Sequence, residues 1–142
     1  MLTTSTPATV PMIHRILGIG LLAGAAVFLG LRYFGIGSIA HGSTSRTVAY
    51  ALGAVAMVLT AIPVFIFRPR VPRRSPAQSL DQFWSAPDVA AKMLQIWFYL
   101  EGAGMLAAAG YLLTGDPVTA IAAILAIAAY WWCGPTLFAN AR

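Results

Sequence analysis

Four long apolar segments, separated by short stretches rich in glycine, proline and charge, dominate the pattern of this chain. A helix crosses the roughly 30 Å of bilayer hydrocarbon in about 20 residues, and only helices satisfy their backbone groups within one segment. Three segments have about this length, and the first reaches it if the helix continues past Arg32 while that side chain snorkels. We therefore predict an all-α, four-helix transmembrane bundle forming one membrane domain over residues 1–142, with helices at about 14–34, 46–67, 86–114 and 117–138.

The connections contain residues that end helices. Three prolines lie within residues 69–76 and should stop the second helix. The sequence Gly115-Asp116-Pro117 predicts a tight turn, with Pro117 opening the fourth helix. Within the second helix, Pro63 removes a backbone hydrogen bond and is expected to disturb the helix near Thr60.

The segment before the third helix has two interpretations. Residues 80–84 combine Leu, Phe and Trp with Asp and Gln, which fits a short amphipathic stretch along the lipid headgroups. An ordinary loop with two aromatic anchors fits equally well. Ser85 to Asp88 resembles a capping box, so the third helix is expected to begin before the membrane.

Composition agrees with lipid as the solvent. The chain is 59% hydrophobic and 9% charged, whereas a soluble domain carries about 25% charged residues. Cys133 is the only cysteine, which excludes an intrachain disulfide. The net charge of +5 lies mostly beside the apolar segments, and no patch interleaves arginines with aromatic residues. We therefore expect no nucleic-acid partner.

The basic residues predict the orientation. With the N-terminus inside, seven of the nine Lys and Arg residues lie on the cytoplasmic side, as the positive-inside rule requires. This predicts a multi-pass protein of the bacterial cytoplasmic (inner) membrane with both termini in the cytoplasm. Anionic lipid headgroups or partner proteins are the expected contacts of the arginines in the middle loop, Arg68, Arg70, Arg73 and Arg74.

Small residues mark expected helix contacts. Residues 18–25 resemble residues 102–109 at an offset of 84 positions. This echo fits two duplicated helical hairpins, or a chance match between helices rich in Gly, Ala and Leu. Small side chains let helices approach closely, and the positions expected to do so are Gly20, Gly24, Gly53, Gly104 and Ala108.

Glu101 is the candidate for chemistry. It is the only Glu in the chain, and at about 1.5 Å per residue it lies roughly 13 Å beyond Lys92 along the third helix. An ionisable group at that depth normally faces the bundle interior and has a partner. Glu101 either binds a proton or cation, or stabilises helix packing alone. If the repeat is real, Arg15 reaches the level of Glu101, which predicts a direct or water-mediated contact with His14 as the alternative partner.

Other chemistry is not indicated. Neither His14 nor His41 has a second ligand at metal-binding spacing, so no metal site is expected. The sequence has no glycine-rich phosphate loop, no nucleophile with a base and no pair of carboxylates at one depth. We therefore expect a non-enzymatic protein and predict no cofactor.

The stretch from Leu94 to Asp116, LQIWFYLEGAGMLAAAGYLLTGD, resembles a group of small four-helix bacterial membrane proteins. In that group one helix carries a leucine–glutamate pair, small residues and a Leu-Leu-Thr-Gly exit. The group is distantly similar to the proteolipid (c) subunits of rotary ATP synthases, which hold an ion on one buried carboxylate. The resemblance implies that Glu101 is the ion-binding carboxylate, but four-helix proteolipids usually carry theirs on the last helix.

Two functions follow as expectations. The first is an accessory or structural subunit of a larger inner-membrane complex, in contact with membrane lipids and other membrane subunits. The alternative is a proteolipid-like or small transporter protein, working as a homo-oligomer, that binds a proton or cation at Glu101.

Overall fold

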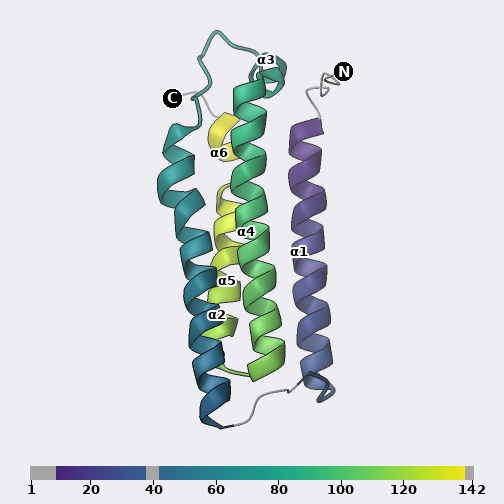
Figure 1. Ribbon diagram of the computed structural model, residues 1–142. Coiled ribbons are helices and arrows are strands. Elements are labelled where there is room, and N and C mark those ends of the chain that lie inside the picture. The colour runs from purple at the N-terminus through teal and green to yellow at the C-terminus, as the bar shows by residue number, and fades with distance from the viewer. Residues whose placement is uncertain (1–8, 38–41, 140–142) are drawn as a thin grey trace.

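The computed structural model describes residues 9–37 and 42–139, which form helices and no strands. This confirms the prediction of an all-α chain (Figure 1). Four helical segments of the described chain are long and apolar enough to cross a membrane, namely Thr9–Tyr33, Ser43–Arg70, Pro87–Thr114 and Pro117–Ala139. The individual elements are α1 (Thr9–Tyr33), α2 (Ser43–Ala61), the π-helical η1 (Ile62–Phe67), the 3₁₀ turn η2 (Arg68–Arg70), α3 (Leu80–Ser85), α4 (Pro87–Thr114), α5 (Pro117–Trp132) and α6 (Pro135–Ala139).

The long helices alternate in direction. Figure 1 shows α1 and α4 running one way along the bundle and α2 and α5 running the other. The start of α1, the segment from η2 to α3, and α6 gather at one end, which we call the α3 end. The basic segment therefore lies at the same end as the beginning of α1 and the end of α6.

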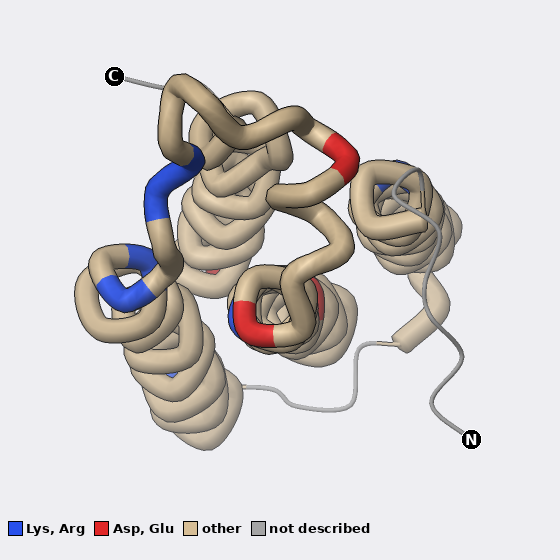
Figure 2. The backbone as a smooth tube through the Cα atoms, turned by 90° about the horizontal axis from the view of Figure 1, so that it is seen from above, with Lys and Arg blue, Asp and Glu red and all other residues tan. Residues whose placement is uncertain are grey.

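Helix α4 is the centre of the bundle. It packs against α1, α2 and α5, and α5 also packs against α2. Helices α1 and α2 hardly touch each other and lie on opposite sides of α4 (Figure 2). The two hairpins are therefore not equivalent, because α4 and α5 pack along their lengths and α1 and α2 do not. The arrangement lacks the symmetry that two duplicated hairpins would show.

The turn between α4 and α5 has the predicted form. Gly115 ends α4 with a φ of 66°, a left-handed conformation that glycine adopts without strain. The Asp116 carboxylate accepts a hydrogen bond from the Val118 N–H at 2.9 Å, and Pro117 opens α5. The Arg32 guanidinium lies directly against Gly115, so any side chain there would displace it.

Pro63 disturbs the second helix as predicted. The chain passes from α2 into η1 at this proline, and the Arg68 N–H reaches back five residues to the Pro63 carbonyl. Close by, the Thr60 hydroxyl donates to the Ala56 carbonyl at 2.8 Å. The wider π turn accommodates a residue without an N–H while the helix continues to Arg70.

The fourth predicted helix is interrupted. The predicted range 117–138 divides into α5 and α6, with Cys133 and Gly134 between them. Pro135 causes the break, because a proline has no N–H to donate and its ring clashes with the carbonyl four residues earlier.

The capping box forms at a different place from the predicted one. Ser79 caps α3, since its hydroxyl accepts from the Gln82 N–H while the Gln82 side chain accepts from the Ser79 N–H. The predicted box from Ser85 is absent, because Ser85 donates to the Gln82 carbonyl and α4 begins after Ala86 without a side-chain cap. The sequence Ser-x-x-Gln at residues 79–82 carried the signal.

Of the two interpretations of residues 80–84, the ordinary loop is wrong, because the segment forms the short helix α3 with exposed polar and buried aromatic residues. The segment is helical, but its two aromatic residues do not face outward. Phe83 is 1% exposed and Trp84 is 5% exposed, and both belong to the main hydrophobic core. Burial of large apolar side chains at the α3 end explains why this short helix folds back over the bundle.

Candidate functional site

Glu101 lies in the seam between α4 and α1. It is partly buried, and a Cβ built on Gly20 would be 3.8 Å from its Oε1 atom. Gly20 is itself exposed, so it leaves the carboxyl open on one side. Within residues 9–37 and 42–139, no ion pair or side-chain hydrogen bond of Glu101 is present. The carboxyl is thus only partly buried and has no ion-pair or side-chain hydrogen-bond partner in this part of the chain.

The predicted direct contact between Arg15 and Glu101 is not formed. Arg15 is exposed, and Glu101 faces Gly20, five residues further along α1. Five residues advance a helix by about 7.5 Å and turn it by about 140°, so Arg15 lies on a different face and at a different level. The depth inferred for Arg15 from the sequence echo, the level of Glu101, therefore differs from its actual depth by about one and a half helical turns.

His14 also does not contact Glu101. We expected it as the alternative partner of the carboxyl, but the side chain is only 3% exposed. Its ring stacks on Tyr130 with centroids 4.6 Å apart and an interplanar angle of 8°. Trp97 lies 4.7 Å away and Trp131 5.4 Å away. His14 therefore belongs to an aromatic cluster that joins α1, α4 and α5.

His14 and Tyr130 exchange contacts with each other's backbone. The Tyr130 hydroxyl donates to the His14 carbonyl at 2.6 Å. The His14 Nε2 atom lies 3.4 Å from the Tyr130 carbonyl and donates to it when that nitrogen carries the proton. This reciprocal pair connects two residues 116 positions apart in the sequence.

The break between α5 and α6 explains these contacts. In a continuous helix the Tyr130 carbonyl would accept from the N–H of Gly134, but that N–H bonds to Trp131 instead. The carbonyl of Cys133 is also free, and the Trp97 indole N–H donates to it at 2.8 Å. A buried carbonyl without a partner is costly, so His14 and Trp97 stabilise the interruption.

Tyr130→Phe tests the reciprocal pair. Removing the hydroxyl leaves the ring stacking intact and should lower the free energy of unfolding in detergent by about 1 kcal/mol, as is typical of buried hydrogen bonds. Denaturant titration of helix content by circular dichroism measures the change. Tyr50→Phe is the matched control, because Tyr50 is 56% exposed. Equal stability of the two variants would show that the hydroxyl contributes nothing.

The small residues named from the sequence occupy different environments. A Cβ on Gly24 would meet Met105 at 2.6 Å, one on Gly53 would meet Val118 at 2.9 Å, and one on Gly104 would meet Leu21 at 2.7 Å. Ala108 lies in a second buried cluster with alanines of α2, α4 and α5. Gly20 differs, because only the Glu101 carboxylate lies near it.

Two close contacts escaped the sequence analysis. A Cβ on Gly18 would lie 3.0 Å from both Tyr130 and Trp131, and one on Gly110 would lie 3.0 Å from Thr119. Both glycines stand among other small residues, so nothing in the residue pattern distinguishes them from Gly20.

The four arginines of the middle segment have separate contacts. The Arg68 guanidinium lies 4.0 Å above the Trp132 ring. The Arg74 side chain donates to the Gln78 carbonyl, and the Arg70 carbonyl accepts from Lys92. Arg73 is exposed and forms no hydrogen bond or ion pair with the described residues. Arg68 and Arg73 line a cavity of about 310 Å³ at the α3 end.

No group of three or more His, Cys, Asp or Glu side chains that could hold a metal occurs in the described part of the chain. His41 lies outside the described residues. Comparison with protein-family models, curated proteins and solved structures finds no match to this chain.

Proposed function

We propose that this protein is a non-enzymatic integral membrane protein of the bacterial inner membrane and an accessory or structural subunit of a larger complex. Its N- and C-termini and the arginine-rich segment lie in the cytoplasm. The observation that carries this proposal is the position of the Glu101 carboxyl, which is partly exposed on the outer surface of the bundle without an ion-pair partner among the described residues.

The cost of this carboxyl in a membrane supports a partner. Glu101 is at the middle of α4, which has 28 residues. A charged side chain at the centre of a bilayer costs about 3 kcal/mol or more. A helix from another subunit that offers a hydrogen-bond donor would remove much of this cost. Such a partner would occupy the open side of the seam that Gly20 leaves uncovered.

The surroundings of Glu101 also suit a neighbouring transmembrane helix. By helical spacing, Ile16 shares a face with Gly20, and Phe98 shares a face with Glu101. Ile16 and Phe98 are each 56% exposed. One polar group surrounded by exposed apolar side chains is a surface that an apolar helix with a single donor would complement.

A second function is favoured by the same open carboxyl. Because no described Arg, Lys or His holds it, Glu101 is free to bind a proton or cation, as in the proteolipid-like alternative. A second copy of this chain would then cover the seam.

Purification in a gentle detergent distinguishes the two functions. We expect other membrane proteins to co-purify in fixed stoichiometry with the wild type and with Glu101→Gln, which keeps a hydrogen-bonding side chain. Glu101→Leu should release them. Phe65→Leu is the control, since Phe65 is 76% exposed on the α2 side of the bundle.

The opposite result is equally specific. Isolation of a homo-oligomer alone, with proton or cation flux in liposomes that Glu101→Gln abolishes, would refute the accessory-subunit proposal and establish Glu101 as an ion site.

A further inference from the structure

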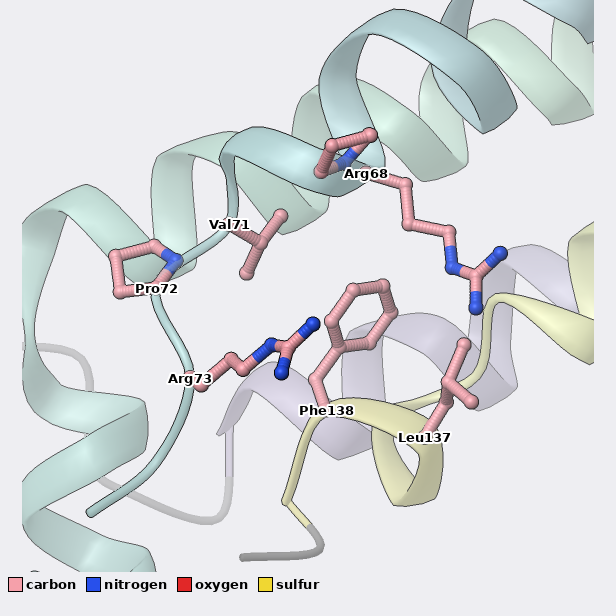
Figure 3. Close-up of a pocket in the computed structure, with 7 residues that line it drawn as sticks. Arg68, Val71, Pro72, Arg73, Leu137 and Phe138 are labelled. Atoms are coloured by element: carbon pink, nitrogen blue, oxygen red, sulfur yellow. The ribbon is translucent and has the colours of Figure 1, made fainter. Parts of the chain in front are cut away.

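A cavity at the α3 end lies apart from Glu101 and has no role in the function proposed above. It opens between the segment that follows η1 and the short helix α6 (Figure 3). Its volume is about 310 Å³. The lining residues are Arg68, Pro69, Val71, Pro72, Arg73, Leu137 and Phe138.

The charge of this cavity is positive. Figure 3 shows the side chains of Arg68 and Arg73 reaching toward α6 on either side of Phe138. No acidic residue lines the cavity, and neither arginine forms an ion pair with a described residue. Two like charges at one cavity, without an acidic residue to neutralise them, favour binding of an anion.

The Arg68 side chain is held by its surroundings. The stacking of Arg68 on Trp132 restricts its guanidinium, because a cation is attracted to the face of an indole ring. Pro69 and Pro72 fix the backbone torsion φ on either side of Val71. A planar guanidinium presents a fork of N–H donors that matches a phosphate group. The site therefore combines one restrained guanidinium, that of Arg68, with a second, exposed one, that of Arg73.

The rest of the cavity is apolar. Val71 is 6% exposed, and Leu137 and Phe138 are partly buried. The cavity also lies at the ends of two helical segments that are long enough to cross a membrane, Ser43–Arg70 and Pro117–Ala139. A ligand that fits this site has a phosphate at the headgroup level and an apolar portion beside it.

We propose that the cavity between η2 and α6 binds an anionic phospholipid, with Arg68 and Arg73 as the cationic contacts of its phosphate headgroup and the acyl portion against Leu137 and Phe138. Arg70 and Arg74 are not part of the site, because neither lines the cavity. This assignment separates a specific lipid site from a general attraction of the basic segment to anionic membranes.

Native mass spectrometry of the purified full chain in detergent tests the site. After delipidation, the protein is titrated with phosphatidylglycerol or with zwitterionic phosphatidylcholine. We expect one phosphatidylglycerol to bind in preference to phosphatidylcholine. Arg68→Gln and Arg73→Gln should each weaken this binding by about tenfold, as expected for loss of one charge-assisted contact.

Arg70→Gln is the matched control, since it removes the same charge from an exposed position two residues from Arg68. It should bind phosphatidylglycerol like the wild type. Arg73→Gln protects the test against misfolding, because Arg73 makes no hydrogen bond within the described chain, and unchanged circular dichroism should verify its fold.

Three results would overturn the proposal. Equal weakening by Arg70→Gln would show nonspecific electrostatic attraction. Equal binding of phosphatidylcholine would show that the site does not select anionic lipid. Displacement of phosphatidylglycerol by millimolar inorganic phosphate, with the same dependence on Arg68 and Arg73, would show that the ligand is a free phosphate.

Discussion

Trp97→Ala should lower the free energy of unfolding in detergent by about 3 kcal/mol, the low end of the range for a buried tryptophan. The side chain is 0% exposed, contacts the His14 ring and donates a hydrogen bond to the Cys133 carbonyl. Its loss leaves a cavity in the aromatic cluster and an unpaired carbonyl at the break between α5 and α6. The low end applies because apolar solvent around an unfolded membrane chain reduces the transfer contribution.

Two variants make this measurement specific. Phe98→Ala changes the next residue of α4, whose side chain is 56% exposed, and should alter stability by less than about 1 kcal/mol. Trp97→Phe keeps most of the ring volume and loses the N–H, so it should fall between wild type and Trp97→Ala. Equal effects of Trp97→Ala and Phe98→Ala in a denaturant titration would show that the cluster does not stabilise the bundle.

Gly104→Leu should destabilise the bundle by about 1–3 kcal/mol, as is typical of overpacking. A Cβ on Gly104 would approach the end of the Leu21 side chain to 2.7 Å and Ala126 to 3.7 Å. Leu21 is 0% exposed, so it has little room to move. The added side chain should therefore push α1 away from α4.

Gly102→Leu is the control on the same helix. Nothing lies within 4 Å of a Cβ at Gly102, and replacing a glycine inside a helix favours the helical state by up to about 1 kcal/mol. We therefore expect the two glycine variants to shift the unfolding midpoint in opposite directions. A stabilising effect of Gly104→Leu would mean that α1 is not held against α4 in the way the structure shows.

The helical content and the turns of this fold could be predicted from the sequence. The length of the apolar segments specifies helices, and Gly115, Asp116 and Pro117 combine three residue types that each favour a turn. The prediction was less accurate at helix ends that lack such residues. Helix α1 begins at Thr9 instead of residue 14. Pro11 does not prevent this, because it lies in the first turn of the helix, where a proline is tolerated.

The faces of the helices could not be predicted. In a soluble helix, polar residues mark the side that faces water, but the described helices here are apolar on nearly every side. Gly20 and Gly18 looked alike in the sequence, yet only Gly18 lies against the aromatic rings of α5. The central position of α4 has no sequence signal for the same reason.

The candidate site was predicted in part. The position of Glu101 along its helix follows from counting residues, and the structure places it at the middle of α4. The partner of Glu101 could not be inferred, because the inference relied on an internal repeat. Such a repeat implies two equivalent hairpins, and the two hairpins are not equivalent. The burial of His14 was missed because the adjacent Arg15 suggested a polar edge. His14 is buried where it meets the free carbonyl of Tyr130. That carbonyl is free because of a helix break that lies more than a hundred residues away in the sequence.

The π-helical segment η1 determines the direction, around the helix axis, in which the later side chains of the second long helix point. One wide turn delays the rotation of a helix by about one residue, which is roughly 100°. The residues up to Thr60 keep the phase that packs α2 against α4 and α5, and the delay then turns Arg68 toward Trp132 and α6. The π turn at Pro63 thus rotates the side-chain direction of the helix. One helix can therefore pack against its neighbours along most of its length and present cationic side chains in a different direction at its end.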